Sequence, residues 1–187
     1  LWPLYGMADS TQTVKKEVAE AAGVAEDAVV GADLYLYDRT PGVIFGADNA
    51  FFASPRIDNL MCAYGTLRGF LDAREVQNAV KVYACFDNEE TGSATKQGAA
   101  SMLLRDTLSR IAESASVDLR RMLANSFMVS ADNGHARHPN HPELSDPKNS
   151  PRLGGGVVVK TNAAQHYTTD GPSAALFGEL CRMAGGP

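Results

Sequence analysis

The first quarter of the chain alternates between helical and strand patterns of apolar residues. Apolar positions recur at helical spacing over Ser10 to Ala22, and Gly23 is placed to end that helix. A period of two over Ala32 to Asp38 predicts a strand. A second apolar stretch follows from Val43 to Phe52. The pattern therefore predicts a helix followed by extended chain.

Beyond residue 50, helices and strands are predicted to alternate. Apolar residues at spacings of three and four predict a broadly apolar, buried helix from Asp58 to Leu71, capped by Asp58 or Asn59. The further predicted strands are Val80–Phe86, Ser126–Ala131 and Val157–Lys160, and the further predicted helices are Gln97–Ile111, Val117–Ala124 and Pro172–Met183. This order predicts the α/β class, with a domain boundary at about residue 50.

Composition narrows the class of protein. A chain of 187 residues suffices for one domain, or for a domain plus part of another, and its formal charge of −5 argues against nucleic acid and anionic membranes as partners. Three widely spaced cysteines indicate reduced core thiols in a cytosolic protein. No apolar run is long enough to cross a bilayer, and the start lacks a signal peptide, so a cytoplasmic protein is expected. The chain does not begin with Met, which indicates a fragment or a processed product.

The strongest candidate chemistry follows the predicted strand Val80–Phe86. Asp87, Glu89 and Glu90 come directly after it, before Gly92. The carboxyl ends of strands in open α/β sheets form the crevice where ligands bind. Neighbouring carboxylates there must be protonated, paired with a cation or bound to metal. A solvated acidic loop explains these residues equally well.

Two further carboxylates strengthen the metal interpretation. Asp58 lies at the start of a predicted helix, and Asp132 follows the predicted strand Ser126–Ala131. A two-metal hydrolase needs a bridging carboxylate, further carboxylate or histidine ligands, and a free carboxylate that takes a proton from water. The polar stretch 133–150, which holds three of the four histidines, is predicted to be a loop at the same sheet edge. The sequence therefore predicts a dinuclear metal site.

Four ordered motifs resemble the aspartyl aminopeptidase family of dinuclear zinc exopeptidases, which remove acidic residues from peptide N-termini. They are Ser-Pro-Arg-Ile-Asp-Asn-Leu at 54–60, Phe-Asp-Asn-Glu-Glu-Thr-Gly-Ser at 86–93, Ser-Ala-Asp-Asn-Gly-His-Ala-Arg-His-Pro-Asn at 130–140, and Lys-Thr-Asn-Ala-Ala-Gln-His-Tyr at 160–167. The resemblance covers the chain from about residue 32 to its end.

The resemblance implies a role for each matching residue. Asp58 is the bridging ligand of two Zn²⁺ ions, Glu90 and Asp132 each bind one of them, and Glu89 is the general base. The substrate contacts are His135, Lys160 and Tyr167. A cation such as Lys160 can pair with the acidic side chain of a substrate. His138, His141 and His166 are interpreted as loop residues.

The resemblance also implies an incomplete protein. The fold is then a partial zinc-exopeptidase α/β/α sandwich at 51–187, and residues 1–50 resemble the end of a lid and dimerisation domain. The chain lacks the N-terminal and C-terminal segments from which the family draws two zinc-binding histidines, and a homo-oligomer is expected. Two alternatives stay open: a non-catalytic scaffold or assembly fragment, and a related dinuclear peptidase of different specificity.

Overall fold

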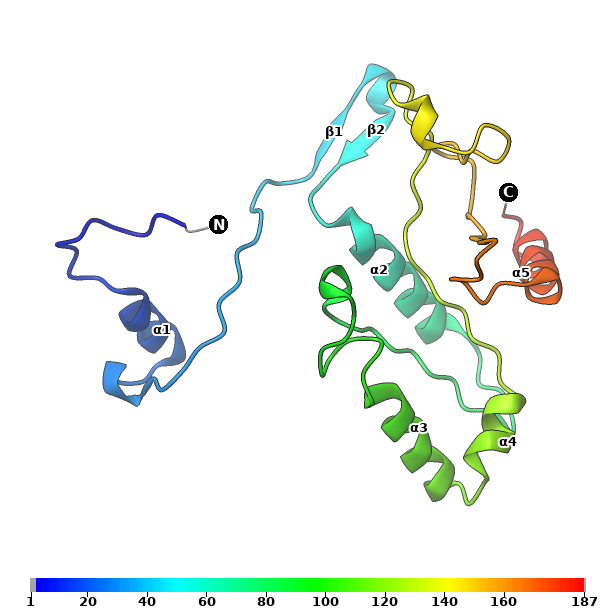
Figure 1. Cartoon of the computed structure of the whole chain (residues 1–187), viewed down its shortest axis with the longest axis horizontal. Coiled ribbons are helices and arrows are strands. Elements are labelled where there is room, and N and C mark those ends of the chain that lie inside the picture. The colour runs from blue at the N-terminus through cyan, green and yellow to red at the C-terminus, as the bar shows by residue number, and fades with distance from the viewer. Residues whose placement is uncertain (1–2, 187) are drawn as a thin grey trace. The chain divides into compact units, whose positions relative to one another are not determined.

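The computed structural model describes residues 3–186 and divides into two compact units, Leu1–Pro55 and Arg56–Pro187 (Figure 1). Each unit has its own secondary structure. The division falls near the boundary predicted at residue 50. The assignment of residues 1–50 to a lid and dimerisation domain concerns the identity of the first unit, and it stays a prediction.

The first helix of the first unit is set by local capping bonds. Helix α1 spans Val14–Ala22 and begins where Thr13 Oγ1 accepts a hydrogen bond from the backbone N–H of Lys16. It ends at Gly23, whose φ of 66° is the left-handed conformation that glycine adopts without strain. The predicted helix and its glycine cap are confirmed, but the helix begins at Val14, four residues after the predicted start at Ser10.

The strands of the first unit are displaced from the predicted position. Residues 32–38 form no strand, and their apolar side chains are exposed. Instead, β1 (Val43–Phe45) pairs antiparallel with β2 (Phe51–Ala53), with Ile44 opposite Phe52. A period of two shows which side chains share a face, but a strand also needs a hydrogen-bonded neighbour. Within residues 3–55, strand pairing joins β1 to β2 alone.

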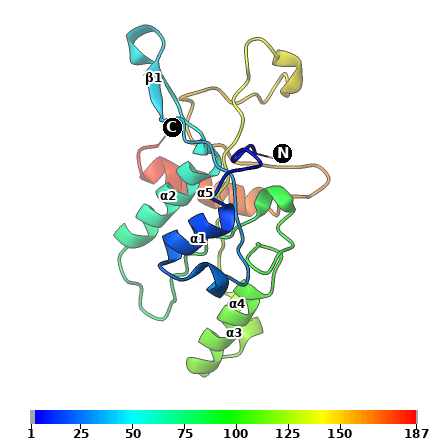
Figure 2. The ribbon, with the colours of Figure 1, turned by 90° about the vertical axis from the view of Figure 1, so that its left-hand side faces the viewer.

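The second unit contains four helices at nearly the predicted positions: α2 (Ile57–Asp72), α3 (Leu103–Ser114), α4 (Leu119–Ala124) and α5 (Gly171–Met183). Asp118 caps α4 by accepting from the backbone N–H of Arg121, and Asp170 caps α5 in a reciprocal pair with Ser173. Pro172 lies in the first turn of α5, as predicted. Helices α3 and α4 contact each other (Figures 1 and 2).

Helix α2 differs from its prediction in two respects. It was expected to be buried, yet Leu60, Met61 and Tyr64 each expose about three fifths of their surface, at 60%, 61% and 66%. Neither Asp58 nor Asn59 caps it, because the N-cap position is Arg56. The peptide bond between Asp58 and Asn59 is cis. The Asn59 side chain accepts a hydrogen bond from another segment, so its oxygen is engaged away from the helix end.

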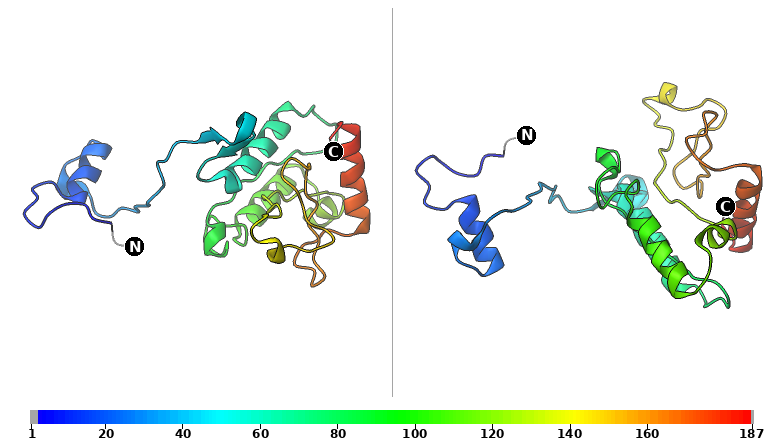
Figure 3. Two further views of the ribbon diagram at one scale, coloured as in Figure 1. Left: turned by 90° about the horizontal axis from the view of Figure 1, so that it is seen from above. Right: turned by 60° about the horizontal axis from the view of Figure 1, so that its bottom comes forward.

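The three strands predicted for the second unit are not paired. Residues 80–86, 126–131 and 157–160 run as coil between the helices, and the hairpin is the only sheet among residues 3–186 (Figure 3). Parallel strands are stable when helices cover both faces of their sheet. Of the apolar side chains described, only those of Ala19 and Ala112 are buried, so these segments have no such cover.

Candidate functional site

The candidate site is built around Asn133, which connects two segments far apart in the sequence. Its backbone N–H donates to Asn59 Oδ1 at 3.1 Å, and its Nδ2 donates to the carbonyl oxygen of Ile57 at 2.9 Å. The Sγ of Cys62 donates to Asn133 Oδ1 at 2.6 Å. Three bonds therefore join residue 133 to the first turns of α2.

Lys160 brings a third segment to the same place. Its Nζ pairs with the carboxylate of Asp132 and also donates to the carbonyl oxygen of Asn133 at 2.8 Å. A Cβ placed on Gly134 would lie 3.7 Å from Val158 Cβ, an ordinary contact distance, so residues 132–134 and 158–160 run side by side. Residues from three of the four sequence motifs therefore meet in one corner of the second unit.

The charges of this corner act on the Cys62 thiol. Burial raises the pKa of Cys62, the Asp132 carboxylate raises it further, the Lys160 ammonium lowers it, and Asp58 raises it. The half-buried Cys62 side chain bonds to Asn133, which also bonds to both neighbours of Asp58 and to Lys160. Three residues that the sequence singled out for a functional site are thus brought together.

The acidic pair Glu89–Glu90 lies in a separate, tightly closed loop. Both side chains are exposed in a 3₁₀ turn at Glu89–Thr91, between Asn88 (φ 60°) and Gly92 (φ 89°). Asn88 Nδ2 donates to Thr95 Oγ1 at 2.9 Å. The backbone N–H of Asp87 donates to the carbonyl oxygen of Gln97 at 3.1 Å, which closes the base of the loop. Backbone geometry therefore orients both glutamates.

The predicted substrate contacts other than Lys160 are on exposed chain. His135 is exposed, and Tyr167 keeps 45% of its surface open to solvent. His138 accepts from the backbone N–H of Asn140, and His141 lies 3.2 Å from Glu143. These two histidines bond within their own loop, as interpreted from the sequence. Roles for His135 and Tyr167 in substrate binding stay predictions.

The donor set for a metal is partial within the described chain. Among residues 3–186, no three side chains of His, Cys, Asp or Glu come together closely enough to hold a metal ion. Asp58 and Asp132 supply carboxylate oxygens of the kind that zinc accepts, but Asp132 is paired with Lys160 and Glu90 lies in its own loop. A zinc site made from Asp58, Glu90 and Asp132 therefore stays a prediction.

Sequence reasoning missed Asn133 and Cys62 as parts of this corner. All three cysteines are free thiols as predicted, but Cys62 is half-buried and Cys85 is exposed, so the core location was wrong. Helical spacing does not relate Cys62 to Asp58, because Asp58 and Asn59 have non-helical dihedral angles. The bonds of Asn133 span more than 70 residues and had no local signal.

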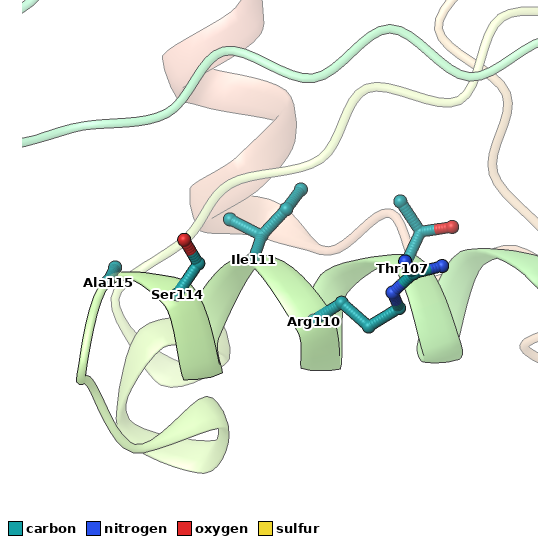
Figure 4. A pocket seen from close by; sticks show the side chains of 5 residues that line it. All are labelled: Thr107, Arg110, Ile111, Ser114 and Ala115. Carbon is teal, nitrogen blue, oxygen red and sulfur yellow. The ribbon is translucent and has the colours of Figure 1, made fainter.

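A hollow on α3 provides no competing site. Thr107, Ile111, Ser114 and Ala115 line it together with Arg110, all from one helix and its end (Figure 4). None of these residues is a carboxylate, a histidine or a thiol. This hollow therefore offers no group that could bind a metal ion or act as a nucleophile.

Comparison with known proteins identifies the family to which the chain belongs. The sequence model of the aminopeptidase I zinc metalloproteases (M18) matches residues 7–187, and the chain belongs to this family. It is 43% identical over 175 residues to a probable M18 family aminopeptidase 2 of Clostridium acetobutylicum, which covers 92% of this chain and 40% of the relative. The family predicted from the four motifs is confirmed.

Two further relatives add detail. A probable aspartyl aminopeptidase of Ricinus communis is 40% identical over 157 residues, covering 79% of this chain and 32% of the relative. The structure of the S. cerevisiae mApe1 dodecamer matches with a TM-score of 0.75 and 31% identity, over 92% of this chain and 41% of that one. This likeness confirms the predicted α/β class. The chain spans about two fifths of the length of the Clostridium acetobutylicum relative.

Proposed function

We propose that the whole protein is an aminopeptidase that removes N-terminal Asp and Glu from peptides at a dinuclear zinc site. The convergence of the segments that carry Asp58, Asp132 and Lys160 in one corner carries the proposal, because it brings two carboxylates near a cation suited to an acidic substrate. Family membership supports peptide hydrolysis with zinc, and the name of the Ricinus relative supports acidic specificity.

The proposed metal ligands are carboxylates from three segments. Asp58 would bridge the two ions, and Glu90 and Asp132 would each bind one. Zinc, when bound, lowers the pKa of a water molecule toward neutrality and polarises the peptide carbonyl group. The exposed Glu89 carboxylate would accept the proton of the attacking water and return it to the leaving amine.

Lys160, His135 and Tyr167 would bind the substrate. Lys160 keeps only a quarter of its side chain exposed, so its charge is partly shielded from water, which strengthens its attraction for a carboxylate. A substrate Asp or Glu side chain would compete with Asp132 for this ammonium group. An uncharged side chain offers it no such partner, which supplies the preference for acidic residues.

The assembly and location follow from the family. The dodecamer of S. cerevisiae mApe1 supports a homo-oligomer for this protein. In the proposal, residues 1–50 belong to a lid and dimerisation domain. No helix in residues 3–186 is long and apolar enough to cross a bilayer. A cytoplasmic location is part of the proposal.

Elemental analysis of the full-length protein, purified without chelator, tests the proposal together with release of Asp from a chromogenic Asp-amide. We expect about two zinc ions per chain and turnover of this substrate. Asp58→Asn should lower the zinc content, whereas Asp33→Asn, which makes the same charge change in the exposed segment 32–38, should not. Unchanged zinc in Asp58→Asn would show that the ligand assignment is wrong.

The scaffold alternative rests on a specific observation, which is that residues 3–186 gather no three metal ligands. A non-catalytic protein would contain little zinc and release no Asp in the same experiment. A dinuclear peptidase of different specificity would bind zinc yet cleave a neutral amide as readily as the Asp-amide. The three functions therefore give three distinct results.

A further inference from the structure

We propose that Asn133 is a positioning residue that fixes the Asp132 carboxylate relative to Asp58. The proposal rests on the proposed function in one respect, namely that these two carboxylates belong to the reacting site. Nothing in the family resemblance singles out residue 133. Its hydrogen bonds do, because each of its four polar groups has a partner in the corner.

The first step concerns the backbone on either side of Asp58. Asn133 bonds to the Asn59 side chain and to the Ile57 carbonyl group, which are the two residues adjacent to Asp58. Asn133 itself is adjacent to Asp132. The path between the two carboxylates runs from Asp132 to the adjacent Asn133, across its hydrogen bonds to Ile57 and Asn59, and on to Asp58, which lies between them. The spacing of the carboxylates therefore depends on Asn133.

The second step concerns what asparagine supplies and other residues do not. The carboxamide donates to the Ile57 oxygen and accepts from the Cys62 thiol at the same time. An aspartate keeps the acceptor but loses the donor, and it would turn a carboxylate oxygen toward the Ile57 carbonyl oxygen beside two other acids. An alanine loses both bonds. Asparagine is therefore the residue type that fits both partners.

The third step concerns Lys160. Its ammonium group is held by the Asn133 carbonyl oxygen as well as by Asp132. A shift of residue 133 would move both acceptors of the Lys160 ammonium group, which are the Asn133 carbonyl oxygen and the Asp132 carboxylate. Asn133 therefore sets the positions of an acid and a cation that both belong to the proposed site, without contacting the substrate.

Kinetics of full-length Asn133→Ala and Asn133→Asp test the inference. We expect kcat on the Asp-amide to fall about 10- to 100-fold, because small displacements of reacting groups cost that much, while KM changes less than about threefold. The melting temperature should stay close to that of the unaltered protein. Asn125→Ala is the matched control, because the Asn125 side chain donates to the Arg121 carbonyl group at the end of α4. Its kcat should not change.

A double-mutant cycle with Cys62→Ala measures how much the hydrogen bond between Cys62 and Asn133 contributes to kcat. If Cys62 acts through Asn133, the double variant should lose no more kcat than Asn133→Ala alone. Fully additive losses would overturn this coupling. A kcat of Asn133→Ala within twofold of the unaltered protein would overturn the positioning role, and so would a fall in kcat explained by the unfolded fraction.

Cysteine labelling tests the contacts of Asn133 even if the protein shows no turnover. Alkylation of Cys62, followed by mass spectrometry, reports on its bond to Asn133, with the half-buried Cys181 in the same chain as the reference. Asn133→Ala should speed Cys62 labelling several-fold and leave Cys181 unchanged, because the thiol loses its acceptor. An unchanged labelling rate of Cys62 would show that the hydrogen bond between Cys62 and Asn133 does not hold this corner together. Absent turnover alone would count only against the proposed function.

Discussion

The ammonium group of Lys160 pairs with the carboxylate of Asp132, although 28 residues separate them in the sequence. Both residues were singled out from different motifs, one for substrate binding and one for zinc. Their pairing means that a proposed specificity residue and a proposed metal ligand share one electrostatic environment. A substrate carboxylate that binds Lys160 should therefore also alter the charge next to Asp132.

Lys160→Met should reduce kcat/KM on an Asp-amide by about 10- to 100-fold, because hydrogen bonds to charged groups contribute about 1.5 to 3 kcal/mol. Cleavage of a neutral Ala-amide should change far less, since that substrate has no carboxylate to pair. Steady-state kinetics on the two amides measure the difference. Lys148→Met, in the exposed loop that follows residue 133, is the charge-matched control. Equal losses on both substrates would contradict a role in specificity.

Glu89→Gln should lower kcat about 10²- to 10⁴-fold, because the amide cannot accept a proton from water. The Glu89 side chain is exposed, so the melting temperature should not change. Kinetics and thermal unfolding of the full-length protein measure both quantities. Glu113→Gln, at an exposed position on α3, should leave kcat at the level of the unaltered protein. Retained activity in Glu89→Gln would rule out this residue as the general base.

Gly98→Ala should destabilise the loop that carries Glu89 and Glu90. A Cβ at this buried position would overlap the carbonyl oxygen of Ser93, which already accepts from the backbone N–H of Ala100. Overpacking of this kind costs about 1 to 3 kcal/mol of unfolding free energy. Denaturant unfolding measures the loss.

Gly178→Ala is the matched control for that change. Gly178 lies in α5, and a Cβ there would have no heavy atom within 4 Å. Alanine in a helix is favoured over glycine by about 1 kcal/mol, so this variant should be as stable as the unaltered protein or more stable. Equal effects of the two substitutions would contradict the steric argument.

Asp170 should make the stability of α5 dependent on pH. The Ser173 hydroxyl and backbone N–H donate to its carboxylate and lower the pKa of Asp170. A carboxyl group with a lowered folded-state pKa stabilises the protein above its unfolded pKa of about 4, and that stabilisation is lost as the pH falls through the folded-state value.

The comparison of Asp170→Asn with Asp170→Ala separates capping from titration. Asparagine is a good N-cap that does not titrate, so Asp170→Asn should keep most of the stability at pH 7 and lose less than the unaltered protein on acidification. Asp170→Ala should be less stable at pH 7. Melting temperatures between pH 7 and pH 2.5 measure this. Parallel curves for Asp170→Asn and the unaltered protein would contradict the assignment.

The local elements were readable from the sequence because their stabilising bonds join near neighbours. Thr13 and Asp118 each accept from a backbone N–H three residues away, and Gly23 ends α1 through its own dihedral angles. The residue types therefore predicted the glycine end of α1 and the proline in the first turn of α5, whereas α1 starts four residues later than predicted. The motifs around Asp58, Glu89 and Asp132 likewise predicted the family, because the order of chemical groups along a chain needs no coordinates.

The contacts between segments far apart in the chain could not be predicted from local sequence patterns. Residues 32–38 and 80–86 have the pattern of strands but join no sheet in the described chain, whereas β1 and β2 pair with each other across at most ten residues of sequence. The corner around Asn133 depends on bonds to residues 57–62 and 160. Such contacts arise only when folding has closed the long loops between them, and no short stretch of sequence encodes that closure.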